Sequence, residues 1–341
     1  PKGPLSAEVQ GRARKRGPVD DAEVLPHFRE ASWEEALEVA GRGLRRVRDE
    51  HGPSAMAGFG SAKCSNEEAY LFQKLVRAGF GTNNVDHCTR LCHASSVAAL
   101  METIGSGAVT NVFADVQNAD LAIITGSNTT ANHPVAATFI KQAVASGRTR
   151  LVVVDPRHSP MASLADPFLQ IRPGTDVALY NAMMHVLIDE DLVDRRFVDQ
   201  RTTGYDQLAR MVRRYDPRTA SAICGVDAED ICEAARALGN ASAAMIFWGM
   251  GISQHIHGTD NSRCLISLML LTGNVGRPGT GLHPLRGQNN VQGASDAGLI
   301  PMVYPGYQSV ADPAVRERFQ EAWHAQLDAH EGLTVVEIMH G

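Results

Sequence analysis

Short apolar runs alternate with longer amphipathic segments through the middle of the chain. Runs typical of buried strands occupy 120–125, 151–154, 168–171 and 244–248. Helical periodicity, with an apolar residue every three or four positions, covers 133–146 and 176–188. Strands that alternate regularly with helices form βαβ units, so the pattern predicts an α/β fold built on a parallel sheet.

The segments on either side of this region are less regular. Helical patterns cover 33–49, 66–79 and 95–103, with Ser32 a plausible N-cap for the first, and 55–60 is a short strand candidate. Residues 1–30 are rich in Pro, Gly and charge and predict an irregular segment. We therefore expect three parts, given by these ranges: an irregular segment at 1–24, a Rossmann-like domain at 88–288, and a second, discontinuous α/β domain at 25–87 plus 289–341.

Each predicted strand ends in a turn that contains Gly, Asn or Asp. The turns are Gly126–Ser127–Asn128, Asp155–Pro156–Arg157, Gly174–Thr175–Asp176 and Gly249–Met250–Gly251. Open parallel sheets bind ligands beyond the carboxyl ends of their strands, so we expect a nucleotide there. No turn spells G-x-G-x-x-G or a Walker P-loop, which argues against ordinary dinucleotide binding and phosphoryl transfer. For Asp155, an ordinary Asp-Pro turn is the alternative.

Composition and charge narrow the class of protein. The 341 residues are 44% hydrophobic and 21% charged, enough for two or three domains with cores that need no disulfides. A net charge of −6 gives no reason to expect nucleic acid binding. The absence of long apolar runs predicts no membrane insertion. Six cysteines favour a reducing compartment, and we expect a cytoplasmic protein. The chain begins with Pro1, and we expect it to belong to a longer protein.

The stretch GTNNVDHCTRLCH at 81–93 carries two cysteines and two histidines. Cys92 comes just before the predicted helix at 95–103, where amide donors and the helix dipole lower the pKa of a thiol. A thiolate there could be a nucleophile or a soft metal ligand, and His93 could exchange a proton with a bound group. The alternative is a structural Cys beside a capping His. Cys88 and Cys92 are four positions apart, but no second pair of cysteines or histidines completes a zinc site.

The stretch HPLRGQNNVQG at 283–293 is polar and punctuated by glycines. It has no amphipathic period, so we predict a loop. Arg286 offers five donors in a fixed geometry, which suits a small carboxylate or a phosphate. Gln288, Asn289 and Asn290 could satisfy a polar heterocycle. A surface loop with a solvated arginine is the alternative.

From about Ser32 to about Trp323 the chain resembles the molybdopterin oxidoreductases of the dimethyl sulfoxide reductase superfamily, and within it the formate dehydrogenases. In those enzymes the metal ligand is selenocysteine or cysteine followed by histidine, which matches Cys92 and His93. Their formate-orienting arginine precedes Gly-Gln-Asn-Asn, which matches Arg286. The resemblance implies oxidation of formate to CO2 at a molybdenum or tungsten bis-molybdopterin guanine dinucleotide centre. It implies cofactor contacts at Gly126, Asn128, Asp155, Arg157, Gly174, Asp176, Gly251, Gln254, Gly287 and Gln288.

The resemblance also implies partners. Electrons would pass through a 4Fe-4S cluster on an N-terminal domain that lies outside this chain. They would continue through iron–sulfur and flavin- or NAD-binding partner subunits to NAD+. Since that domain and the C-terminal domain of the family are not found in these 341 residues, we expect the isolated chain to be inactive.

Three rival functions remain open from the sequence. A nitrate reductase of the same superfamily would share Cys92 but typically lacks the following histidine. A non-catalytic electron-transfer subunit should have lost both motifs, and a plain NAD-binding dehydrogenase needs a glycine fingerprint. The presence of Cys92–His93 together with Arg286 therefore favours formate dehydrogenase.

Overall fold

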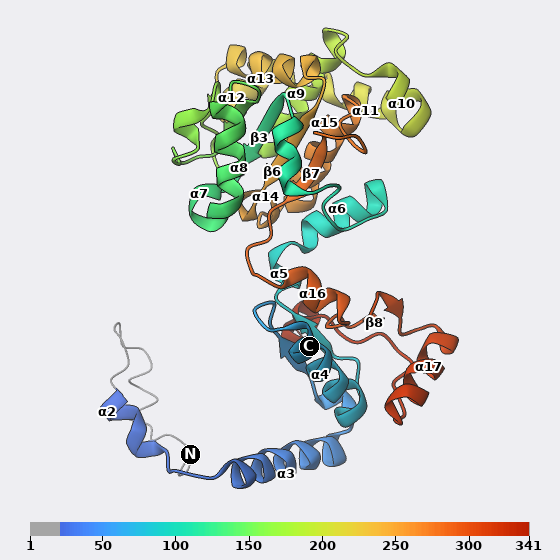
Figure 1. Ribbon diagram of the computed structural model, residues 1–341. Helices are drawn as coiled ribbons and strands as arrows, with labels where there is room; N and C mark the ends of the chain where they lie inside the picture. Colours follow the sequence, from blue (N-terminus) through green and yellow to red (C-terminus); the bar gives the residue numbers. More distant parts are fainter. Residues whose placement is uncertain (1–20, 341) are drawn as a thin grey trace.

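A five-stranded parallel sheet forms the centre of the upper part of the computed structural model, which describes residues 21–340 (Figure 1). The strand order is β5–β4–β3–β6–β7, so the chain runs outward from β3 in both directions. The strands are β3 Leu121–Thr125, β4 Arg150–Val154, β5 Phe168–Leu169, β6 Ala244–Trp248 and β7 Gly281–Pro284. The predicted α/β fold with a parallel sheet is confirmed, and β3 and β6 flank its topological switch point.

Alternate residues of the central strands pack into two hydrophobic cores, one on each face of the sheet. Ile123 packs into a core on one face of the sheet, and Ile124 into a core on the other. Burial on both faces explains why these strands are continuous apolar runs instead of alternating ones. The helices of this part are α6 Ala94–Ile104, η4 Phe113–Asn118, α7 Thr129–Asn132, α8 Pro134–Ala145, η5 Ala162–Leu164, α9 Asp176–Asp189, α10 Arg195–Arg201, α11 Tyr205–Val212, α12 Pro217–Cys224, α13 Ala228–Asn240, α14 Met250–Ser253 and α15 Gly258–Leu271.

The prediction of a loop over 283–293 is wrong for both ends of that stretch. His283 and Pro284 complete the edge strand β7, which pairs with β6 from Met245 to Trp248. Residues from Val291 onward begin α16 Val291–Asp296. The strand has no apolar run because pairing with β6, and not its own propensity, stabilises it. Its proline is the last strand residue at a sheet edge, where proline is tolerated.

The lower part of the molecule joins two segments that are far apart in the sequence (Figure 1). The buried guanidinium of Arg77 donates to the carbonyl oxygens of Gly298, Ile300 and Val303. The domain boundaries given above stay a prediction. The elements of this part are β1 Gly58–Gly60, α4 Asn66–Lys74, the π-helical segment η3 Leu75–Phe80, β2 Val85–His87, α16, β8 Val303–Tyr304, β9 Gln308–Ser309, α17 Pro313–Trp323 and α18 Val335–His340.

The N-terminal region extends away from both parts (Figure 1). As predicted, Ser32 caps α3 Trp33–His51 by accepting a hydrogen bond from the Glu35 amide. The expected irregular segment is partly helical, since α2 Asp21–Val24 and η1 Leu25–His27 precede α3; a proline in the first turn of η1 suits a helix start. The short element η2 Pro53–Ala55 follows α3. Residues 1–20 lie outside the described residues. No helix within 21–340 is long and apolar enough to cross a bilayer.

Candidate active site

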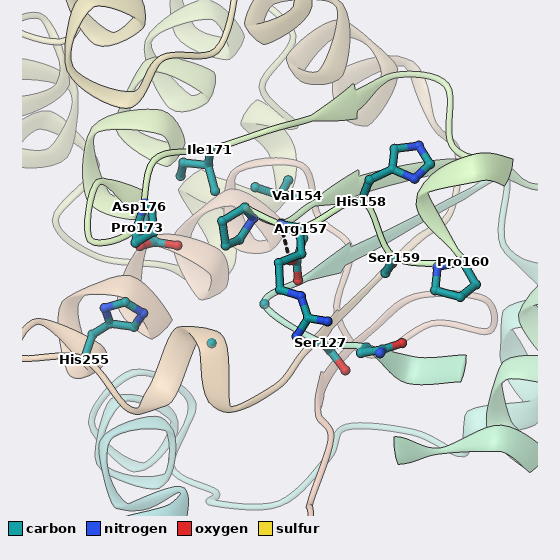
Figure 2. Close-up of a pocket in the computed structure, with 15 residues that line it drawn as sticks. Ser127, Val154, Arg157, His158, Ser159, Pro160, Ile171, Pro173, Asp176 and His255 are labelled. Carbon is teal, nitrogen blue, oxygen red and sulfur yellow. Dashed lines mark hydrogen bonds between the residues drawn. The ribbon is translucent and has the colours of Figure 1, made fainter. Parts of the chain in front are cut away.

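A pocket of about 290 Å³ opens beyond the carboxyl ends of the central strands (Figure 2). It lies where the nucleotide was expected, next to the switch point between β3 and β6. Its lining comprises Gly126, Ser127, Asn128, Val154, Asp155, Pro156, Arg157, His158, Ser159, Pro160, Ile171, Pro173, Asp176, Gly251 and His255.

Two glycines bring the ends of β3 and β6 into backbone contact at the pocket. A Cβ atom on Gly126 would lie 2.7 Å from the carbonyl carbon of Gly251, and one on Gly251 would lie 2.7 Å from the Cα of Gly126. Gly126 also has a φ of +56°, which L side chains rarely adopt. The pocket therefore has a wall of bare backbone that a ligand can approach closely.

Two carboxylates line the pocket, Asp155 directly after β4 and Asp176 at the first position of α9. Asp155 accepts a hydrogen bond from the Arg157 amide at 2.8 Å. It therefore starts a turn, which was the alternative considered for this Asp-Pro sequence. Burial raises the pKa of Asp155, and the Arg157 amide and charge partly offset this rise. Burial also raises the pKa of Asp176, which lies on the same side as His255 in Figure 2. Both carboxylates are thus partly desolvated and would gain from binding N–H donors.

Unpartnered polar atoms in the pocket test whether it fits a nucleotide. Asn128 Oδ1 and Ser159 Oγ are buried without a hydrogen-bond partner in the described part of the chain. Buried polar atoms are normally paired, so a ligand with donors and acceptors would satisfy them. Together with the backbone wall and Arg157, these atoms fit a polar, phosphate-bearing group.

The structure divides the expected cofactor residues between two places. Six of them line the pocket: Gly126, Asn128, Asp155, Arg157, Asp176 and Gly251. Gly174 is adjacent in sequence but does not line it, and Gln254, Gly287 and Gln288 lie instead around Cys92, as described below. His158, Ser159 and His255 also line the pocket and were not predicted from the sequence. The first two directly follow Asp155–Pro156–Arg157, so their position after a strand end was the available signal.

Cys92 lies at the junction of two helices, α5 Thr89–Cys92 and α6. Its Sγ lies 3.5 Å from the Sδ of Met250, which precedes Gly251. The expected lowering of its pKa is wrong: burial raises it, and Cys88 adds to the rise. The reason is that His93 separates Cys92 from the first residue of α6, while segments distant in sequence cover the thiol.

The loop after β7 brings Arg286 and Gly287 to Cys92. The Gly287 amide and the Arg286 guanidinium both favour the thiolate of Cys92, against the effect of burial. Burial also lowers the pKa of Arg286. Arg286 Nη2 donates to the carbonyl oxygen of Gly107 at 2.8 Å, which fixes one edge of the guanidinium. The two sequence motifs therefore meet at one site.

His93 is fully buried and engaged at both ring nitrogens. Nε2 lies 3.0 Å from the carbonyl oxygen of Leu285, so this nitrogen carries the proton and donates. Nδ1 then accepts from Ser253 Oγ at 3.3 Å. Burial and the nearby Arg286 lower the pKa of His93 to about 3, so the ring is neutral. In this arrangement His93 positions the loop before Arg286.

Polar side chains bind the turn of Cys92 to its surroundings. Gln254 Nε2 donates to the carbonyl oxygen of Leu91 at 2.8 Å, and Cys88 Sγ donates to Gln288 Oε1 at 2.7 Å. Across residues 21–340, no three His, Cys, Asp or Glu side chains converge as a metal-binding set. A metal here would thus depend on Cys92 and on ligands that a cofactor brings.

Comparisons with known proteins give the family. The model of the molybdopterin oxidoreductase family matches residues 26–334. The chain is 46% identical over 310 residues to the F420-dependent formate dehydrogenase 1 subunit alpha of Methanococcus maripaludis, covering 91% of this chain and 45% of that protein. It is 43% identical over 311 residues to formate dehydrogenase H of Escherichia coli, covering 91% and 43%.

A solved structure agrees with the fold. Acetylene hydratase from Pelobacter acetylenicus matches with a TM-score of 0.66 and 25% identity, covering 75% of this chain and 34% of that one. The chain spans less than half the length of the two curated relatives named above. With a family model that matches most of the sequence and relatives above 40% identity, the chain belongs to the molybdopterin oxidoreductase family.

Proposed function

We propose that the enzyme carrying this chain oxidises formate to CO2 at a molybdenum or tungsten centre ligated by Cys92. The observation that carries the proposal is the meeting of Cys92 with Arg286 and Gly287 at one half-buried site. Relatives at more than 40% identity are named formate dehydrogenases. When bound, the metal centre supplies the acceptor for the two electrons that formate releases.

Arg286 is the residue that we propose for formate binding. Its Nη2 is committed to Gly107, and the guanidinium has further N–H groups that can bind a carboxylate. Because Arg286 is partly desolvated, a charge-assisted bond to formate is stronger there than in water. This contact would hold the carboxylate of formate beside Cys92.

Cys92 and His93 have different proposed roles. With its raised pKa, the free Cys92 thiol holds its proton at neutral pH, so metal ligation must release that proton. The Gly287 amide and Arg286 charge then stabilise the bound thiolate. His93 keeps the Leu285–Arg286 backbone against Cys92 through its Nε2–H bond. Since Nε2 already carries a proton, a proton from formate would be taken up at Nδ1 in place of the hydrogen bond from Ser253, and we propose this proton handling as a second, transient role.

The pocket beyond the strand ends is the proposed site of a guanine dinucleotide. The Asp176 carboxylate can accept from the two adjacent N–H groups of a guanine, and its partial desolvation strengthens such bonds. Arg157 and the bare backbone at Gly126 suit the diphosphate. Gln254, Gly287 and Gln288, around Cys92, are proposed contacts of the pterin side, and Gly174 is proposed to shape the turn that leads into α9 at Asp176.

The electron acceptor and the partners are proposals from the family likeness. We propose a 4Fe-4S cluster on a domain outside this chain, partner subunits that carry iron–sulfur and flavin or NAD sites, NAD+ as acceptor and a cytoplasmic enzyme. Two relatives are named alpha subunits of F420-dependent formate dehydrogenases, which supports a multi-subunit assembly and makes F420 the rival acceptor.

The test uses the native enzyme that contains this chain. Metal analysis should find molybdenum or tungsten with released guanine nucleotide, and formate should reduce a viologen dye. Assays with NAD+ and F420 then identify the acceptor. Nitrate-dependent oxidation of reduced dye without formate activity would instead establish a nitrate reductase, and absence of both metals would contradict the proposal.

A further inference from the structure

The short helix that carries Cys92 is anchored by a buried carboxylate. Helix α5 has only four residues, and a single helical turn is not stable by itself. Asp86, the middle residue of β2, is 1% exposed, and its Oδ2 accepts from Arg90 Nε at 2.9 Å. Arg90 lies on α5, two positions before Cys92. The turn therefore has a charged, desolvated attachment to the lower part of the molecule.

The same carboxylate oxygen also binds a segment much later in the chain. The Val335 amide donates to Asp86 Oδ2 at 3.1 Å. Two residues earlier, the Leu333 amide donates to Asn84 Oδ1 at 2.9 Å. The segment at 333–335 thus lies along β2 and is bound by the side chains of Asp86 on that strand and of Asn84 directly before it.

We propose that Asp86 is a positioning residue for Cys92 and that the segment at 333–335 takes part in this function. One oxygen holds both Arg90 of α5 and the Val335 amide, so removing either donor changes how the carboxylate holds the other. The orientation of the Cys92 thiol toward Met250 and Gly287 follows that of α5. Only the effect of this positioning on catalysis rests on the proposed ligand role of Cys92.

The other side-chain contacts of this turn are weaker, and one of them, from Arg90 Nη2 to the Sδ of Met302 at 4.0 Å, is also made to the lower part. Gln254 binds the Leu91 carbonyl, and Cys88 binds Gln288; both bonds are neutral. A charge-assisted hydrogen bond is roughly twice as strong as a neutral one. Asp86 is therefore expected to control the position of α5 relative to the lower part, while the neutral bonds adapt.

Two substitutions break the link at different points. Asp86→Asn keeps the size of the side chain and removes its charge. Val335→Pro deletes the amide donor at the first residue of α18, a position where proline is tolerated. The reciprocal Thr334–Glu337 hydrogen bonds that begin this helix do not involve the Val335 amide.

Two controls separate positioning from loss of stability. Val335→Ala changes the same side chain and keeps the amide. Asp115→Asn alters a carboxylate on η4 that accepts hydrogen bonds from Asn111, Asn118 and the Gly279 amide and makes none to α5.

The primary measurement is the alkylation rate of Cys92 by iodoacetamide in cofactor-free enzyme, followed by peptide mass spectrometry. Cys232, half-buried on α13, is the internal reference. Asp86→Asn and Val335→Pro should each change the Cys92-to-Cys232 rate ratio roughly threefold or more, because local opening governs access to a covered thiol. Both controls should keep the wild-type ratio, even though Asp115→Asn lowers the melting temperature.

A second measurement uses the loaded enzyme. The kcat for formate should fall in Asp86→Asn and Val335→Pro while the KM stays near the wild-type value, because Arg286 is untouched. An unchanged alkylation ratio in both variants, or an equal change in Asp115→Asn, would overturn the positioning role and leave the proposed function intact. If Asp86→Asn does not fold, Val335→Pro decides alone. A changed ratio in the variants, with no formate activity in the wild-type enzyme, would support the positioning role and refute the proposed function.

Discussion

His93 Nε2 lies 3.0 Å from the carbonyl oxygen of Leu285, the residue before Arg286. This hydrogen bond joins two motifs that lie 192 positions apart in the sequence. A bond to backbone fixes the path of the chain more firmly than a bond to a mobile side chain. The same imidazole therefore links the residue after the proposed metal ligand to the backbone before the proposed formate-binding arginine.

The first prediction concerns Cys92. In the native enzyme, Cys92→Ser should lose formate oxidation and most of the bound metal, because a hard oxygen replaces a soft sulfur at the metal. The measurements are metal content and formate-dependent dye reduction. Cys232→Ser is the matched control, since this thiol is also half-buried but lies on α13. Normal metal content with normal turnover in Cys92→Ser would remove the ligand role.

The second prediction concerns substrate binding by Arg286. Arg286→Lys keeps the charge and loses the planar fork, so formate should lose one charge-assisted bond. Such a bond contributes about 1.5–3 kcal/mol, and the KM for formate should rise about ten- to a hundredfold. Arg277→Lys is the control, because that guanidinium binds the carbonyl oxygens of Gly273 and Ser242. An unchanged formate KM in Arg286→Lys would restrict this arginine to supporting the loop.

The third prediction concerns the nucleotide pocket. Asp155→Ala should lower the guanine nucleotide content of the purified enzyme, because it removes a pocket carboxylate and the acceptor of the Arg157 amide. Asp120→Ala is the control. Asp120 accepts from the Ser242 and Ala243 amides at the opposite end of β3, so it should cost stability without loss of nucleotide. Equal nucleotide loss in both variants would point to general destabilisation.

The fourth prediction is a pH dependence of stability. Burial lowers the pKa of His283 from 6.5 to about 4, and its Nε2 lies 2.7 Å from Asn111 Oδ1. Between these two values the unfolded chain binds a proton that the folded chain does not. The contribution of His283 to the free energy of unfolding is therefore fully present above pH 6.5. It falls as the pH drops toward 4, by about 3 kcal/mol at most.

Chemical denaturation at several values between pH 4 and pH 7 measures this effect. His283→Gln keeps a hydrogen-bonding group for Asn111 and cannot take up the proton. The variant should therefore show a shallower loss of stability toward acid than the wild type. Parallel curves for the two proteins would show that His283 does not contribute.

The sequence predicted the strands whose own residues are buried on both faces. Ile123, Val153 and Ile246 lie in continuous apolar runs, so no distant partner was needed to identify them. Strand β7 was missed because Gly281 to Pro284 carry no such run, and their pairing with β6 is a property of the assembled sheet. Tertiary context of this kind is absent from a local pattern.

The same limit applies to the candidate site. The residue types at Cys92 and Arg286 signalled metal and carboxylate chemistry, and the structure brings them together. The direction of the Cys92 pKa was mistaken, because Met250 lies 158 positions away and covers the thiol. Burial of a single side chain depends on contacts that spacing along one segment does not contain.

The chain passes between the upper and lower parts of the molecule at only two places visible in Figure 1, near α5 and in the stretch between β7 and α16. Cys92 lies on the first crossing and Arg286 on the second. A rotation of one part against the other would therefore change the separation of Cys92 and Arg286, the proposed metal ligand and the proposed formate-binding arginine. Mechanical coupling of this kind would let a docking event far from the pocket set the catalytic geometry.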